Sequence, residues 1–218
     1  GPAAVAWPMS GVTAHTVLEH VLPYWRRYGL PHFAQFDNDT RFQGGHNHPD
    51  VLGRVVRVCL SLGITPIFVP TREHGFQAVI EHFNGLWQAK VWQRFHHADL
   101  AMVQSRSEQF LAAYCRRMAQ RTEHSPPRRP FPTDWSLNLQ ARPRGQVIYL
   151  RRTDAQGHVS LLGRSFLVDP VWPHRLLRCE VDFEHHQIRC YRLRRREPNQ
   201  QPLVKTIEYV FPKKRFLE

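Results

Sequence analysis

Hydrophobic residues recur every three to four positions in four stretches of the chain, a spacing typical of amphipathic helices. These stretches cover residues 14–28, 50–62, 76–91 and 99–119. Thr13 can cap the first helix, and Gly29 can end it. Two short apolar runs, residues 33–36 and 64–69, predict buried strands. The order helix, strand, helix, strand, helix predicts an α/β core.

The pattern changes after a proline-rich stretch. Residues 121–143 contain five prolines, a composition typical of an extended, semi-rigid connector. Short alternating strands follow at residues 146–151, 158–162, 165–169, 176–183 and 187–193, with turn residues at 154–157 and 184–186. Strands of this length and spacing predict a small β-barrel. We therefore expect a core over residues 3–120, a linker over 121–143 and a barrel over 144–218.

Charge points to a polyanionic partner. The formal net charge is +12, and residues 141–218 hold 16 of the 30 Lys and Arg against 8 of the 18 Asp and Glu. A charge run is usually a solvated face; the alternative is a phosphate-binding surface. The residues expected to contact nucleic acid are the arginines Arg128, Arg129, Arg189, Arg192, Arg194, Arg195 and Arg196, together with the amides Gln77, Asn84 and Gln88.

Cysteine spacing and hydropathy indicate the cellular compartment in which the protein is expected. The four cysteines show no Cys-x-x-Cys spacing, which favours reduced thiols in a cytosolic protein. No apolar run approaches the length of a membrane-spanning helix, so we expect no membrane partner. The His46-Asn47-His48 segment lacks the further ligands of a tetrahedral zinc site and is interpreted as a solvated loop.

Two carboxylates stand out as candidate chemistry. Asp37 directly follows the first predicted strand, and Glu81 lies on a polar face of the helix over residues 76–91. Gln77, Asn84 and Gln88 share that face. A strand-end Asp that meets a helix-borne Glu suits two-metal phosphoryl chemistry, in which Mg²⁺ ions sit roughly 3.5–4 Å apart. Spacing alone fits equally well a second interpretation, in which Asp37 is an ordinary loop residue and Glu81 an ordinary solvated helix residue. Asp39, on the same loop as Asp37, is an alternative metal ligand.

Three motifs in order resemble a known family: Asp37-Asn38 followed by Phe42, the run Leu62-Gly63-Ile64-Thr65-Pro66, and Val79-Ile80-Glu81-His82-Phe83-Asn84. Together they are similar to the catalytic core of insertion-sequence transposases in the retroviral-integrase superfamily, the DDE recombinases. The resemblance covers roughly residues 5–120. It departs from the family pattern at Asp39 and Ala78, where glycines are usual.

The resemblance implies a fold and an activity. It implies an RNase H-like core followed by a small SH3-like barrel, with Asp37 as the second Asp and Glu81 as the Glu of the triad. The first Asp would lie on a strand upstream of residue 5, so the chain would be an N-terminally truncated transposase, inactive alone. It further implies two Mg²⁺ or Mn²⁺ ions, DNA transposon ends and target as partners, a homo-oligomer on DNA, and a nucleoid-associated place in the bacterial cytoplasm. The alternative is a non-catalytic DNA-binding or transpososome-assembly module with the same fold.

Overall fold

The computed structural model describes residues 1–45, 48–70, 73, 75–194 and 196–213. These residues divide into two compact units that are interleaved along the chain. A helical unit takes the described residues of Gly1–Tyr28 and His74–Arg128, and a sheet unit takes those of Gly29–Glu73 and Arg129–Glu218. Residues 144–218 therefore share a unit with residues 29–73, where the sequence suggested a separate domain.

The helical unit contains four helical segments: α1 (Ala14–Tyr28), α4 (Ala78–Trp87), the π-helical turn η1 (Gln88–Trp92) and α5 (Leu100–Thr122). Residues 5–8 form neither a helix nor a strand. Phe83 and Val91 are buried as the periodicity predicts, and Phe83 contacts the rings of Phe110 and Tyr114 on α5. The expected stripe is only partly buried, because Val79 is 84% exposed.

The sheet unit begins with a parallel pair of strands. β1 (Phe33–Phe36) runs parallel to β2 (Thr65–Phe68), with Phe36 opposite Phe68. Parallel strands need a crossover connection, and α2 (Thr40–Gln43) and α3 (Arg54–Ser61) lie in it. The apolar side of α3 is buried, including Val56, Cys59 and Leu60. This β-α-β arrangement confirms an α/β class.

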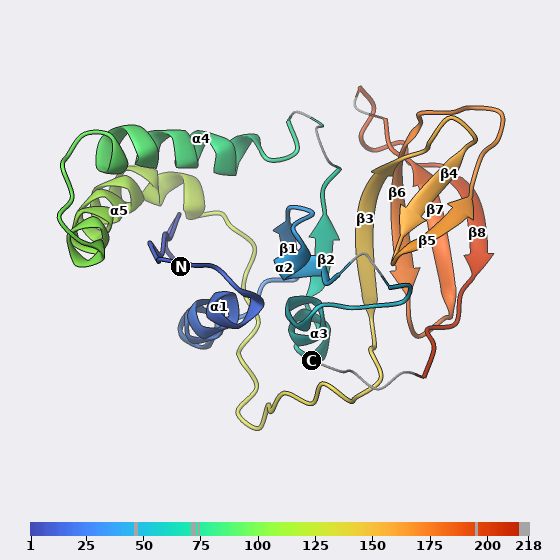
Figure 1. Ribbon diagram of the computed structural model, residues 1–218, viewed down its shortest axis with the longest axis horizontal. Coiled ribbons are helices and arrows are strands. Elements are labelled where there is room, and N and C mark those ends of the chain that lie inside the picture. Colours follow the sequence, from blue (N-terminus) through green and yellow to red (C-terminus); the bar gives the residue numbers. More distant parts are fainter. Residues whose placement is uncertain (46–47, 71–72, 74, 195, 214–218) are drawn as a thin grey trace. The chain divides into compact units, whose positions relative to one another are not determined.

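Strands from the second half of the chain continue the same sheet (Figure 1). The order is β1-β2-β3-β6-β7-β8, and β4 pairs with β5 in a separate hairpin. The bounds of these strands are β3 Gln146–Arg152, β4 His158–Leu161, β5 Arg164–Leu167, β6 Leu176–Asp182, β7 Gln187–Arg192 and β8 Leu203–Glu208. The first five match the predicted strands closely, whereas β8 was not expected.

The expected closed barrel is not present among the described residues. β3 pairs on one side with β2, where Ile67 lies opposite Ile148, and on the other side with β6. Both edges of β3 are therefore occupied within an open sheet. The physical reason lies in the continuous buried run from Val147 to Leu150, which is typical of a central strand covered on both faces. Removing residues 144–218 would consequently strip β3 from β2 and expose the core.

One hydrophobic core serves the whole sheet unit. It includes Leu52 and Val56 from the α3 region, Phe68 from β2 and Tyr149 from β3. The rings of Phe68 and Tyr149 stack with centroids 5.3 Å apart.

No helix of the described residues is long and apolar enough to cross a membrane. The four cysteines are free thiols, as expected.

Candidate functional site

Asp37 lies at the carboxyl end of β1, next to the carboxyl end of β2. Its side chain is exposed, and its Oδ1 accepts a hydrogen bond from the backbone N–H of Asp39 at 3.0 Å. The N–H of Val69, just beyond β2, donates to the carbonyl of Phe36 at 3.2 Å. In open α/β sheets this edge, beyond the carboxyl ends of parallel strands, is where ligands usually bind. The sequence prediction for the local placement of Asp37 is confirmed.

A chain of side-chain hydrogen bonds fixes the loop that carries Asp37. The Asn38 amide donates to the carbonyl of Val69, and its Oδ1 accepts a hydrogen bond from Nε2 of Gln43 at 3.0 Å. The guanidinium of Arg151, on β3, donates to Oε1 of Gln43 at 3.3 Å. Burial lowers the pKa of Arg151. Residues from the crossover and from β3 thus hold the backbone beside Asp37.

Asp39, the rival ligand, has a local structural role. Its carboxylate caps α2 by accepting a hydrogen bond from the N–H of Arg41 at 2.8 Å, and it also forms an ion pair with the Arg41 guanidinium. The side-chain and backbone hydrogen bonds from Arg41 lower the pKa of Asp39 to about 2. A carboxylate engaged in this way is less suited to a metal than the exposed Asp37 next to it.

Glu81 lies in the first turn of α4, exposed to solvent. Asn84 is exposed on the same helix. Gln77, which directly precedes the first residue of α4, is half-buried. Gln88 is exposed at the start of η1, where the helix changes from α to π geometry. The indole N–H of Trp87 donates to Oγ of Ser107 at 2.8 Å, which ties α4 to α5. The polar residues predicted around Glu81 therefore lie mainly at the surface.

The two predicted metal ligands belong to different units. Asp37 is in the sheet unit and Glu81 in the helical unit, so a shared metal site remains a prediction. Within the described residues, no three His, Cys, Asp or Glu side chains form a group that could hold a metal ion. As a donor, the exposed carboxylate of Asp37 fits Mg²⁺, which prefers hard oxygen ligands.

Several arginines predicted to bind nucleic acid form ion pairs within the sheet unit. Arg189 lies 3.2 Å from Glu180 and 3.6 Å from Asp182, and Arg194 lies 2.6 Å from Glu197. The guanidinium of Arg192 lies 5.1 Å from the centre of the Trp172 ring. Arg196 is exposed, and Arg195 lies outside the described residues. Nearby carboxylates thus offset the charge of Arg189 and Arg194.

The two linker arginines behave differently. Arg129 donates to the carbonyls of Leu62 and Gly63, at 3.2 and 2.7 Å, and bridges to Leu30 through its backbone. These contacts bind the linker to the residues that directly follow α3. Arg128 is exposed in the helical unit, where its guanidinium lies 5.4 Å from the centre of the Tyr24 ring.

A basic groove on the helical unit was not anticipated. It has a volume of about 510 Å³ and lies between η1 and α5, with Lys90 and Arg94 on one side and Arg106 and Arg117 on the other. The guanidinium of Arg106 lies 3.8 Å from the centre of the Phe95 ring. The described residues that line the groove include no Asp or Glu. Helical spacing could have revealed it, because Arg106, Phe110 and Arg117 fall on one face of α5.

Comparison with models of known protein families finds no match for this chain, and comparison with curated proteins finds no related sequence.

Proposed function

We propose that this chain is part of a DNA transposase of the retroviral-integrase superfamily, which cuts DNA strands and joins them to a target. The observation that carries the proposal is the exposed carboxylate of Asp37 at the carboxyl end of a parallel strand, held by Asn38 and its hydrogen bonds. The parallel pair β1-β2 with its helical crossover is compatible with part of an RNase H-like core. The three motifs that resemble the family support it further.

The antiparallel strands β3–β8 are proposed as the counterpart of the family's SH3-like module. In this chain the module would be open along β3, because β3 pairs with β2. Such an arrangement would make the module an extension of the core sheet. It also explains why Arg151, on β3, contacts the network beside Asp37.

Asp37 and Glu81 would hold Mg²⁺ or Mn²⁺. When bound, such ions polarise a phosphodiester and stabilise the charge that develops on the attacking and leaving oxygens. The residues of this chain would do the positioning. The hydrogen bonds of Asn38, Gln43 and Arg151 would keep Asp37 in place, and the amides of Gln77, Asn84 and Gln88 would contact the DNA strand.

DNA binding would draw on positive charge from both units. The groove with Lys90, Arg94, Arg106 and Arg117 lies in the same unit as Glu81, and it joins cationic side chains to the aromatic ring of Phe95. Cations contact phosphates, and aromatic rings stack on bases. We expect sequence-tolerant binding that weakens steeply as salt is raised, because counterions are released on phosphate neutralisation.

The activity assay compares three proteins on labelled DNA that carries the element's own ends. No Asp precedes Asp37 in this sequence, so we expect this chain to bind DNA but neither nick nor join it in Mg²⁺ or Mn²⁺. A longer chain, extended at its N-terminus by a strand that carries an Asp, should perform both reactions. Glu81→Gln in the longer chain should abolish both, since Gln keeps the shape and removes the charge.

A second candidate is a DNA-binding or assembly module without catalysis. It is favoured by the basic groove, which fits a polyanion whether or not strands are cut. The same assay separates the two proposals. If the longer chain binds its DNA ends yet neither nicks nor joins them with metal and partner supplied, the proposal of a non-catalytic module replaces the proposal of an enzyme.

A further inference from the structure

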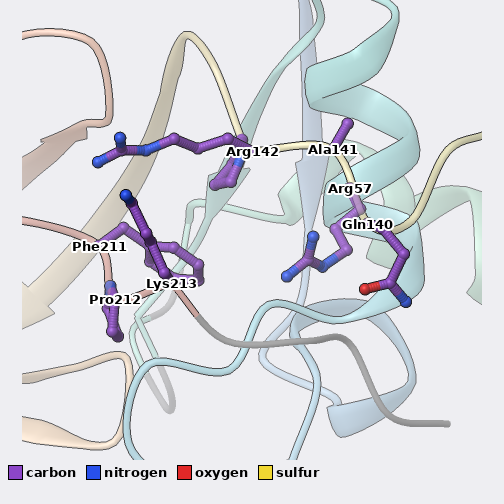
Figure 2. Close-up of a pocket in the computed structure, with 8 residues that line it drawn as sticks. Arg57, Gln140, Ala141, Arg142, Phe211, Pro212 and Lys213 are labelled. Atoms are coloured by element: carbon purple, nitrogen blue, oxygen red, sulfur yellow. The ribbon is translucent and has the colours of Figure 1, made fainter.

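A cavity of about 700 Å³ lies on the sheet unit, and Asp37 is not among its lining residues (Figure 2). Three segments meet around it: α3, the linker near residues 140–143, and the tail that follows β8. The tail is anchored by Phe211, which is buried and packs edge to face on Phe183 with ring centroids 5.4 Å apart. That anchor places Lys213, two residues later, at the cavity.

Among the described residues that line the cavity, every charged side chain is a cation. Arg57 enters from α3, Arg142 from the linker and Lys213 from the tail, and the described lining residues include no Asp or Glu. In Figure 2 the charged ends of Arg142 and Lys213 lie toward the same side of the view, whereas the guanidinium of Arg57 lies apart from them. Arg142 and Lys213 are both exposed. The described residues of this cavity wall therefore contribute three positive charges and no carboxylate.

Arg57 is held in place by the linker. One of its terminal nitrogens donates to the carbonyl of Leu139 at 2.9 Å. Burial lowers the pKa of Arg57, which means that its charge is poorly solvated. Gln140 and Ala141 complete the linker wall, so part of the wall can also form neutral hydrogen bonds.

We propose that this cavity binds a backbone phosphate of DNA through Arg57, Arg142 and Lys213. The inference rests on the proposed function, because it takes DNA as the partner, and it adds a contact site that the arginine run of β7 does not provide. The cavity is open rather than a closed ligand chamber, and its cations come from three segments along one surface. A continuous strand can cross such a surface and place one phosphate in it.

Amine footprinting tests the site directly. The chain has only four lysines, and Lys205 on β8 is an exposed internal reference in the same unit as Lys213. Acetylation of each lysine is measured by mass spectrometry with the whole chain alone, with duplex DNA, and with inorganic pyrophosphate. DNA should slow acetylation of Lys213 severalfold and leave Lys205 nearly unchanged.

A binding titration with a matched control gives the second readout. Arg142→Gln with Lys213→Gln removes two exposed charges of the cavity, and Arg121→Gln with Lys205→Gln removes two exposed charges elsewhere. Loss of one phosphate contact should reduce the slope of log K against log salt by about 1. The cavity variant should show that loss, and the control variant should keep a slope close to that of the unaltered chain.

The outcomes separate this inference from the proposed function. Protection of Lys213 together with the reduced slope supports the site. If DNA binds normally while Lys213 stays unprotected and both variants behave alike, the inference is overturned and the proposed function stands. Protection by pyrophosphate but not by DNA also overturns it, in favour of a small-anion site. Failure of the unaltered chain to bind DNA would instead contradict the proposed function itself.

Discussion

The hydroxyl of Tyr209 donates a hydrogen bond to Oδ1 of Asp50 at 2.8 Å, joining residues 159 positions apart. Asp50 is 3% exposed and also accepts hydrogen bonds from the guanidinium of Arg164, at 2.7 and 2.5 Å. The segment before α3, the β4-β5 hairpin and the end of β8 therefore meet at one carboxylate. Burial and the hydrogen bond to Asp50 raise the pKa of Tyr209, so its hydroxyl remains a donor at neutral pH.

Tyr209→Phe should lower the free energy of unfolding by about 1–2 kcal/mol, because a buried carboxylate loses one of its donors while the ring is kept. Urea titration followed by fluorescence measures the change. Tyr191→Phe is the control, since the structure records no hydrogen bond between the Tyr191 hydroxyl and the described residues. Equal effects of the two substitutions would show that the Asp50 contact contributes nothing specific.

Two glycines with similar backbone angles should respond very differently to alanine. Gly157 has φ +81°, and a Cβ there would lie 1.9 Å from the carbonyl oxygen of Asp169. Gly145 has φ +77°, but the nearest atom to its Cβ would be a Leu60 methyl at 3.9 Å. We expect Gly145→Ala to cost about 1–2 kcal/mol from the left-handed backbone alone.

Gly157→Ala should cost at least about 3 kcal/mol, because the backbone at Asp169 must also move. Thermal unfolding of both variants measures the difference. Val168 and Asp169 both donate backbone hydrogen bonds to the carbonyl of Gly157, so the displacement should disturb the end of β5. Similar melting temperatures for the two variants would mean that the close approach at Asp169 is not present in solution.

Asp39 should titrate well below an ordinary Asp. Its folded-state pKa is about 2 because Arg41 donates to it, whereas an unperturbed Asp titrates near 3.9. The resulting stabilisation is complete above pH of about 4 and is lost as pH falls through the folded value. A carbon-detected NMR titration of the Asp39 carboxyl should give a midpoint near 2. Arg41→Gln should move that midpoint upward, and an unchanged midpoint would contradict the capping contact.

Local patterns predicted most of the individual elements. The apolar run over residues 33–36 matches the position of β1, although this strand is not buried as predicted and Phe33 is exposed. The spacing over residues 99–119 matches most of α5. Pairing between distant strands was harder to predict, because a hydrophobic pattern does not identify a partner. The four consecutive buried residues of β3, Val147 to Leu150, were nevertheless a signal for a central strand. β8 was missed because its residues are mostly exposed.

Contacts between side chains of distant segments could not be predicted from the sequence. The link from Asn38 through Gln43 to Arg151 joins residues more than a hundred positions apart. The cavity with Arg57, Arg142 and Lys213 likewise depends on three segments meeting in space. The arginine run near residue 190 is the converse case: its charge is conspicuous in the sequence, but the ion pairs of Arg189 with Glu180 and Asp182 are visible only in the fold.

The most direct test of the account asks whether Asp37 and Glu81 share a metal ion, with carboxylates roughly 4–8 Å apart as ligands at about 2.1 Å would require. Substoichiometric Mn²⁺ is added to isotope-labelled protein, and paramagnetic broadening of backbone amide signals is recorded. We predict strong broadening at Asp37 and at Glu81 together, and a marked loss of broadening at Asp37 in Glu81→Gln. Broadening at Asp37 that is unchanged by Glu81→Gln, or confined to one of the two residues, would contradict the shared site.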